Sequence, residues 1–233
     1  MAVIYSARCR DPALGTAPRI TGMASDTKLD MESADLERAV QYLREGGIVA
    51  IPTDTLYGLA VDVFNCSAID RVFAVKGRPK DLALPVLVGD WNQVKRVAKN
   101  LSPQARTLAD SFWPGGLTLV LEKADGLPDQ VTAEGQTVAV RMPDHPVPIH
   151  LTQGLGLPIT GTSANISGRA DLLSLTELTN QIGGLVDQVI TAGPEPKGIA
   201  STVIDITGGE PKLLRQGVIS FESILEAWET GRR

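Results

Sequence analysis

Short apolar runs bounded by turn residues alternate along this chain with segments of helical periodicity. The runs are at most about five residues long, far below the roughly 20 apolar residues that a membrane span requires. They have the length and the flanking Gly and Pro residues of buried strands. Because strands and helices are intermixed and several strands are adjacent in sequence, the pattern predicts an α/β fold. Its sheet would be twisted and mixed parallel/antiparallel, with flanking helices. The length of 233 residues fits one domain.

Local signals mark where the helices begin and end. Apolar residues recur at helical spacing from Leu36 to Leu43, and two glycines then end the pattern. Ser102 and Pro103 have the pattern of an N-cap followed by a first-turn proline, and Ser174 with Glu177 has that of a capping box. We therefore expect helices at 33–45, 67–76, 103–112, 145–153, from 175 onward and at 220–229, and strands at 48–51, 84–88, 117–122, 137–142, 158–161, 189–191, 201–206 and 212–214.

The N-terminal region and the overall composition set further expectations. Residues 1–31 have no sustained periodicity, which predicts a disordered leader before a domain at 32–233; a transit peptide or a true start at Met23 are the alternatives. The net charge is −5, whereas a generic nucleic-acid coat has a basic excess. Cys9 and Cys66 are the only cysteines and form neither a disulfide framework nor a zinc pattern, so a reducing, cytoplasmic location is expected.

The familiar catalytic templates are missing from the sequence. It contains no Gly-x-Gly-x-x-Gly, no phosphate loop ending in Gly-Lys-Ser/Thr and no Gly-x-Ser-x-Gly elbow. Neither His145 nor His150 lies near a cysteine or an evident nucleophilic serine. A hydrolase triad is therefore not supported.

Polar residues instead cluster where strands and helices end. Each group has an ordinary structural explanation, such as a turn, a helix terminus, an N-cap or a solvated arginine. Together, however, they place four cations at element ends in a chain of negative net charge, which is unfavourable unless an anion binds there. The pattern predicts a pocket for a polyphosphate, built from Thr53–Thr55 after the first strand, Lys76 and Arg78 after the second helix, Arg141 and Arg215 at strand ends, residues 161–165, and Ser201.

At this level of detail the sequence resembles the YrdC/Sua5 family, the threonylcarbamoyl-AMP synthases, in the short, single-domain, TsaC-like form. The likeness covers roughly residues 33–220, and only 18 residues follow Arg215. The family's signature pairs Lys-x-Arg with Ser-x-Asn, here Lys76, Arg78, Ser163 and Asn165. The matching stretches are PTDTLYGLA (52–60), KGRP (76–79), LPVLV (84–88), WPGGLTLVL (113–121), TVAVRMPDHP (137–146), ITGTSANISG (159–168), STVID (201–205) and LLRQG (213–217).

The resemblance implies a wide, positively charged concave cleft and a specific reaction. L-threonine, bicarbonate and ATP, with Mg²⁺ but no dedicated protein ligands for it, would give threonylcarbamoyl-AMP and pyrophosphate. A separate transferase would use this product to modify adenosine 37 of tRNAs; the oligomeric state is not implied. The implied site residues are Lys76 and Arg78 for catalysis; Lys76, Arg78, Thr137, Ser163, Asn165 and Arg215 for ATP; and Thr55, Arg141, Gly161 and Ser201 for threonine.

The sequence departs from the family pattern at one position, and two other functions are alternatives to this interpretation. Several family members have a His in a Leu-Pro-x-x-Val-His context after KGRP, whereas residues 84–90 here read LPVLVGD. An alternative function is a double-stranded RNA or tRNA-binding module of the same fold, which would use cationic phosphate contacts. A paralogue with another activity is a second alternative. Asn65 lies outside the motifs, so Asn65→Ala is expected to leave activity nearly unchanged.

Overall fold

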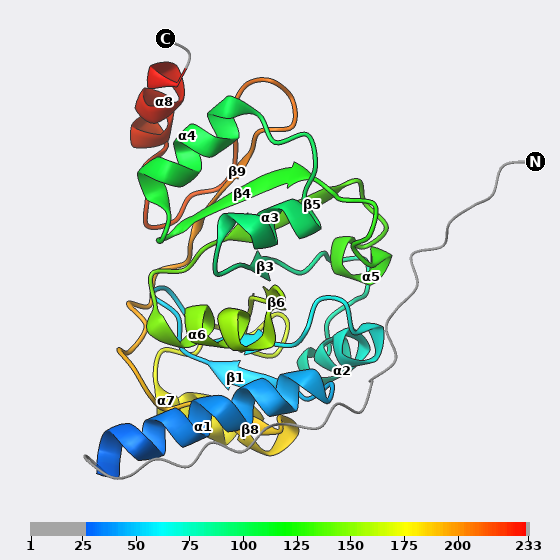
Figure 1. Cartoon of the computed structure of the whole chain (residues 1–233), viewed down its shortest axis with the longest axis vertical. Coiled ribbons are helices and arrows are strands. Elements are labelled where there is room, and N and C mark those ends of the chain that lie inside the picture. Colours follow the sequence, from blue (N-terminus) through cyan, green and yellow to red (C-terminus); the bar gives the residue numbers. More distant parts are fainter. Residues whose placement is uncertain (1–26, 232–233) are drawn as a thin grey trace, which may run out of the picture.

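The computed structural model describes residues 27–231, with side chains from residue 33 onward. Its strands form a six-stranded sheet of order β10-β9-β4-β5-β3-β6 and a four-stranded sheet of order β7-β2-β1-β8, stacked along the long axis of the molecule (Figure 1). The predicted mixed α/β class is confirmed, with the strands divided between two sheets instead of one. The elements are α1 (Thr27–Arg44), β1 (Val49–Ile51), β2 (Gly58–Ala60), α2 (Cys66–Lys76), β3 (Val86–Leu87), α3 (Trp91–Val97), α4 (Pro103–Phe112), β4 (Leu117–Glu122), α5 (Asp129–Thr132), β5 (Thr137–Arg141), α6 (Pro146–Leu155), β6 (Ile159–Thr160), β7 (Thr162–Ser163), α7 (Leu175–Ile182), η1 (Gly183–Leu185), β8 (Gln188–Val189), β9 (Thr202–Asp205), β10 (Lys212–Arg215) and α8 (Phe221–Thr230).

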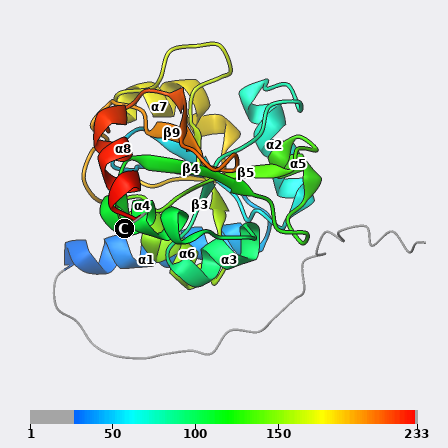
Figure 2. The same cartoon turned by 90° about the horizontal axis from the view of Figure 1, so that it is seen from above.

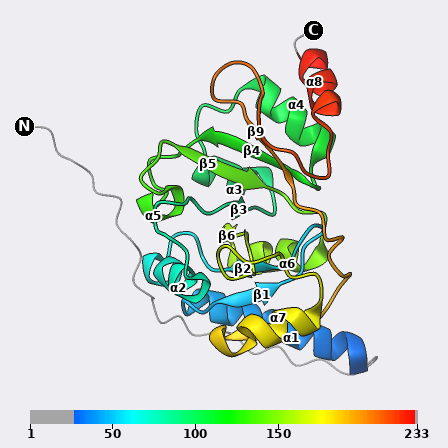
Figure 3. The same cartoon turned by 180° about the vertical axis from the view of Figure 1, so that it is seen from behind.

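The six-stranded sheet carries the larger core. Strand β4 pairs antiparallel with β5 and parallel with β9, and its Leu117 and Leu119 are fully buried. Helices α4 and α8 lie side by side (Figure 2), at the end of the molecule farthest from α1 (Figure 3). Buried Leu108 of α4 and Ile224 of α8 belong to the same hydrophobic cluster as the β4 leucines. This packing fixes the strands whose ends reach the pocket described below.

The four-stranded sheet is covered by α1 and α6. Ala39 and Leu43 of α1, Val49 of β1 and Leu151 of α6 form a second hydrophobic cluster. The apolar periodicity therefore identified the correct face of α1, but the helix begins at Thr27 instead of residue 33. Residues 27–31, expected in the leader, belong to this helix. The rest of the expected leader lies outside the described residues.

The two sheets meet at the segment from β6 to β7. Strand β6 pairs with β3 in the six-stranded sheet, and β7 pairs with β2 in the four-stranded sheet. The Thr160 hydroxyl strengthens the junction by donating to Leu59 O at 2.8 Å and accepting from Val61 N at 3.1 Å. Gly161 is the one residue between the two strands. The predicted GTSAN stretch thus lies where the chain crosses from one sheet to the other.

The predicted N-caps at Ser102 and Ser174 are confirmed. The Ser102 hydroxyl accepts from Ala105 N at 3.1 Å, and Ser174 accepts from Glu177 N at 3.2 Å. The Glu177 carboxylate accepts from Leu173 N instead of returning to Ser174, so only half of the capping box forms. Within residues 27–231, no helix combines the length and apolar character needed to cross a bilayer.

Candidate active site

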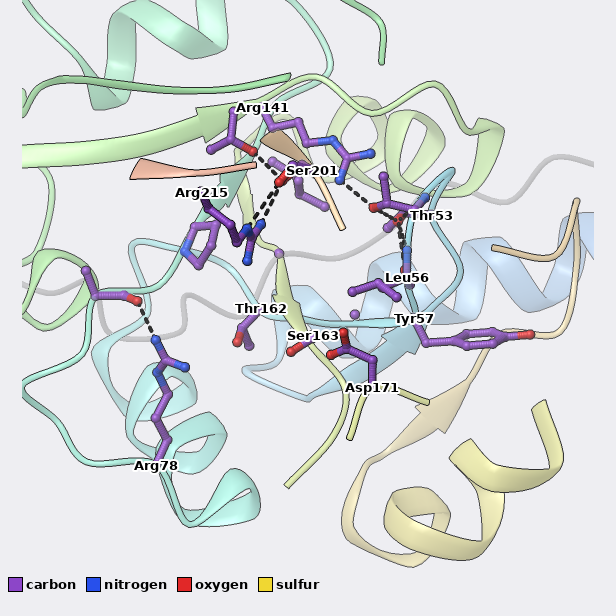
Figure 4. Close-up of a pocket in the computed structure, with 17 residues that line it drawn as sticks. Thr53, Leu56, Tyr57, Arg78, Arg141, Thr162, Ser163, Asp171, Ser201 and Arg215 are labelled. Atoms are coloured by element: carbon purple, nitrogen blue, oxygen red, sulfur yellow. Dashed lines mark hydrogen bonds between the residues drawn. The ribbon is translucent and has the colours of Figure 1, made fainter. Parts of the chain in front are cut away.

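A pocket with a volume of about 190 Å³ opens beside the crossing between the two sheets. Figure 4 shows side chains from both sheets and from the segment after α2 converging on it. Most of the predicted site residues line this pocket, although they are spread over some 160 positions of sequence: Thr55, Arg78, Arg141, Gly161, Ser163, Ser201 and Arg215. The predicted convergence of the arginines is therefore observed.

Arg78 reaches the pocket because of how α2 ends. Gly77 adopts a left-handed conformation with φ 56°, and its N–H bonds to Ala74 O, as in a glycine C-cap. The turn directs Arg78 toward the cavity, where its Nη2 donates to Ala83 O at 2.9 Å and its Nε to Leu82 O at 3.3 Å. Both partners are neutral carbonyls. They hold the guanidinium without cancelling its charge, and both N–H groups of Nη1 remain for a ligand.

Arg141 is the most firmly held of the three arginines. It ends β5, and its guanidinium donates from Nε to Gly115 O at 2.8 Å, from Nη1 to Thr55 Oγ1 at 2.6 Å and from Nη2 to the Asp54 carboxylate. The Arg141 and Asp54 side chains are 7% and 8% exposed. Burial lowers the pKa of Arg141 from its usual value, and the Asp54 carboxylate opposes this change. One N–H on each terminal nitrogen remains, enough to bind a carboxylate at two points.

Arg215 enters from the end of β10. Its Nη2 donates to Ser201 Oγ at 3.0 Å and its Nε to Ser201 O at 3.1 Å. The Ser201 hydroxyl also contacts Thr118 Oγ1 at 2.8 Å. Arg141 and Arg215 are thus each joined to a buried hydroxyl that lines the pocket. Arg215 itself is exposed at the mouth.

Lys76, predicted to contact phosphate, does not line the pocket. It is 2% exposed, and its ammonium donates to Ser163 O and to Asn165 O, the latter at 2.6 Å. Burial, assisted by nearby Arg78, lowers the pKa of Lys76 to about 8, although Asp171 opposes the change. The lysine holds the 163–165 backbone from behind instead of facing the cavity.

Asn165 and Thr137 are also outside the pocket lining. The Asn165 side chain donates to Arg169 O at 2.6 Å and accepts from Ser163 Oγ at 2.6 Å, so it supports Ser163 from behind. Thr137 is exposed at the far end of β5 from Arg141. At about 3.3 Å per residue, the four-residue separation amounts to roughly 13 Å. The structure therefore does not bring Thr137 to the predicted ATP site.

Several pocket residues were not predicted. Asp171 is the only carboxylate that lines the cavity among the residues the structure describes, and Thr118 and Leu87 line it as well. Gly89, which follows the Leu-Pro-x-x-Val stretch in place of the family's His, lies against α6. A Cβ there would come within 2.3 Å of Thr152 Oγ1. The packing at this position thus has no room for a histidine.

The loop at 193–198 passes behind Thr55. Gly198 N donates to Thr55 O at 2.9 Å, and His145 Nε2 contacts Pro194 O at 3.0 Å. Since His145 Nδ1 accepts from Val147 N at the start of α6, the proton must be on Nε2, which donates to the carbonyl. Burial lowers the pKa of His145, in keeping with this neutral form. The loop is therefore attached near one end to His145, the N-cap of α6, and at the other to Thr55 of the pocket lining.

Comparison with known proteins identifies the family. The Sua5/YciO/YrdC family model, described as telomere recombination, matches residues 41–217. The chain belongs to this family. A threonylcarbamoyl-AMP synthase of Bacillus subtilis (strain 168) is 38% identical over 198 residues, covering 84% of this chain and 57% of that protein. A putative threonylcarbamoyl-AMP synthase of Mycobacterium tuberculosis (strain H37Rv) is 37% identical over 197 residues, covering 84% of this chain and 90% of its own length.

Solved structures of the Sua5/YciO/YrdC family have the same fold. The structure of Pyrococcus abyssi Sua5 complexed with L-threonine superimposes with a TM-score of 0.80 at 38% identity. The match covers 82% of this chain and 56% of the Sua5 chain. The chain thus spans little more than half the length of the Bacillus and Pyrococcus relatives and most of the length of the mycobacterial one.

Proposed function

We propose that this protein is an L-threonylcarbamoyladenylate synthase, a nucleotidyltransferase that joins L-threonine, bicarbonate and ATP and releases pyrophosphate. The observation that carries the proposal is the convergence of Arg78, Arg141 and Arg215 on one hydroxyl-lined pocket. Relatives at 37–38% identity bear the name threonylcarbamoyl-AMP synthase, and the similar Sua5 structure holds L-threonine. No other pocket described in the chain is lined by three arginines.

Threonine is assigned to the Arg141 side of the pocket. The two N–H groups left on Arg141 suit the carboxylate of an amino acid. Thr55 and Ser201 supply hydroxyl oxygens nearby, and Gly161 lines the same pocket. The volume of about 190 Å³ is below the roughly 300–1,000 Å³ of pockets for drug-sized ligands. The enclosed part therefore suits an amino acid, with the nucleotide extending through the mouth.

The triphosphate is assigned to Arg78 and Arg215. Each has a guanidinium nitrogen with both N–H groups unused by the protein, and Ser163 lies beside them in the lining. Lys76 and Asn165 act on this region through the 163–165 backbone and the Ser163 hydroxyl. Lys76 would therefore serve catalysis by positioning, while Arg78 would neutralise charge on the phosphates.

The reaction divides into two bond-forming steps. The threonine ammonium group first loses a proton to solvent; the neutral nitrogen then bonds to the carbon of bicarbonate and water leaves, which gives N-carboxythreonine. A carboxylate oxygen of that carbamate then bonds to the α-phosphorus of ATP as the bond to pyrophosphate breaks. Since the attacking oxygen already carries negative charge, the second step requires no general base. The protein would act by positioning and by electrostatic stabilisation.

The pocket residues fit a Mg²⁺ ion that arrives with ATP. In the described part of the chain, no three His, Cys, Asp or Glu side chains gather where they could hold a metal. Mg²⁺ commonly binds through one or two carboxylates plus substrate phosphates and keeps several waters. Asp171, the carboxylate of the pocket lining, is the residue that would hold it. The ion would supply positive charge to the triphosphate.

The decisive experiment offers the protein ATP, bicarbonate and one amino acid at a time and measures pyrophosphate release. Release that depends on threonine supports the proposal. Absence of release, together with duplex RNA binding that falls steeply with salt, would favour the RNA-binding alternative. We further propose that the product serves the modification of adenosine 37 of tRNAs by a separate transferase, in the cytoplasm.

A further inference from the structure

A directed chain of hydrogen bonds lies behind the threonine side of the pocket. Arg141 Nη1 donates to Thr55 Oγ1 at 2.6 Å, Thr55 Oγ1 contacts Thr53 Oγ1 at 3.0 Å, and the Thr53 hydroxyl donates to Leu56 O at 2.7 Å. Both hydroxyls are buried, Thr55 at 4% and Thr53 at 5% exposure. Figure 4 shows Thr53 and Arg141 on the same side of the pocket.

The direction of every proton in this chain follows from counting. A hydroxyl has one proton and two lone pairs. The Thr53 proton is given to Leu56 O, so in the contact between the two hydroxyls Thr55 must be the donor. Thr53 Oγ1 also lies 3.2 Å from both Thr55 N and Leu56 N, so its two lone pairs are shared among three donors. Its capacity is therefore used within the protein, with nothing left for a ligand.

Counting the proton and lone pairs of the Thr55 hydroxyl in the same way leaves it a single hydrogen-bonding role toward the cavity. Its proton points to Thr53 and one lone pair accepts from Arg141. The second lone pair remains, so Thr55 presents an acceptor and no donor. A ligand group beside it can hydrogen-bond to it only as a donor.

We propose that Thr53 is a positioning residue that fixes Thr55 as an acceptor and thereby selects an α-amino acid. This inference rests on the proposed function. When Arg141 holds the carboxylate of an amino acid, the group next to that carboxylate is the amine, whose N–H matches the Thr55 lone pair. A carboxylic acid without that amine lacks the matching donor. Thr53 sets this preference although its own hydroxyl is saturated by the protein.

The test compares Thr53→Val with Thr53→Ser. Valine keeps the shape but frees the Thr55 proton to rotate toward the ligand. We expect KM for L-threonine to rise about tenfold, the factor that corresponds to one lost hydrogen bond, while KM for ATP changes less than twofold. Serine keeps the hydroxyl and should restore KM for L-threonine to near the wild-type value. The matched control is Thr152→Val, which removes a buried hydroxyl that donates to Pro148 O in α6 at 2.9 Å.

Binding measurements separate this inference from the proposed reaction. The Kd of L-threonine and of 3-hydroxybutyrate, which lacks the amine, are obtained by competition against labelled threonine. The ratio of the 3-hydroxybutyrate Kd to the L-threonine Kd should fall about tenfold in Thr53→Val, since only threonine loses a partner. An unchanged ratio, an equal rise in KM for ATP, or a serine variant as impaired as valine would overturn the inference. Threonine binding that depends on Thr53 without pyrophosphate release would overturn only the reaction. No threonine binding by the wild type would overturn both.

Discussion

Arg78 offers the sharpest test of the phosphate side of the pocket. The change is Arg78→Ala, which removes a guanidinium held by Leu82 O and Ala83 O and facing the cavity. Removing one preorganised donor at a developing charge costs about 3 kcal/mol. At 1.36 kcal/mol per decade, this predicts a loss of roughly 150-fold in kcat/KM for ATP.

Folding should change much less than activity in this variant. The two hydrogen bonds from Arg78 to backbone carbonyls are exposed to solvent. Because water can replace the guanidinium as donor, the free energy of unfolding should fall by only about 1 kcal/mol or less. Arg78→Lys keeps the charge but not the planar set of donors. We expect it to recover part of the activity, because the positive charge alone still attracts phosphate.

The assay follows pyrophosphate release with ATP varied and threonine and bicarbonate saturating, alongside thermal unfolding of each variant. Arg38→Ala is the matched control, since the Arg38 side chain is 63% exposed on α1 and its contact with Asp35 is 3.8 Å long. Such exposed pairs contribute about 0–1 kcal/mol. Wild-type turnover in Arg78→Ala, or a loss of the same size in Arg38→Ala, would refute the reasoning.

Three further changes test the supports of the pocket. The pKa of Lys76 is about 8 in the folded protein, against an ordinary value of 10.5. Between pH 8 and pH 10.5 the unfolded chain therefore binds more protons than the folded one. The free energy of unfolding should consequently rise over this range of pH. Urea titrations at several pH values should show no such rise for Lys76→Met. The control variant Lys95→Met, at an exposed site, should show the same rise as the wild type. Asn65 caps α2 by accepting from Ala68 N at 3.0 Å; Asn65→Ala should cost about 1 kcal/mol of stability in denaturant titrations while pyrophosphate release stays unchanged. In Gly161→Ala the new Cβ would lie 2.4 Å from Leu87 Cγ, and this overpacking should lower the free energy of unfolding by about 1–3 kcal/mol. Adding Leu87→Ala should partly relieve the clash. The relief is measured as the coupling energy between the two substitutions.

The parts of the fold that were predicted correctly have short-range causes. The start of α4 at Pro103 follows from its Ser102 cap, and the end of α2 follows from Gly77. Strand β4, Leu117–Glu122, has the predicted bounds. The division into two sheets depends on pairings distant in sequence, such as β2 with β7. The two strands that were not predicted, β2 and β7, have three and two residues beside polar turns and carry too little apolar pattern to be recognised.

The differences between the predicted site residues and the observed pocket lining have geometric causes. Lys76 follows Ile69, Val72 and Phe73 at i+7, i+4 and i+3, so helical periodicity itself places it on the buried face of α2. Thr137 and Arg141 share a strand whose length separates them. Asp171 lies in a segment without periodicity or a capping signal, so nothing local distinguished it. Strand-end Arg141 and Arg215 were predictable because strand ends gather at a sheet edge.

The way each arginine is held explains how an acidic chain keeps a site for two different ligands. Arg78 is held by carbonyls and Arg215 by Ser201, so both keep their full charge toward the cavity, with Asp171 as the opposing carboxylate. Arg141 is paired with buried Asp54. The carboxylate neutralises most of the arginine's positive charge, so Arg141 acts on a ligand mainly through its oriented N–H donors. A zwitterionic amino acid needs donors and acceptors in register but little net charge, whereas a triphosphate needs net positive charge. If the proposed function holds, the pocket would divide into a nearly neutral half for the amino acid and a cationic half for the nucleotide, which would keep the triphosphate from competing for the threonine side.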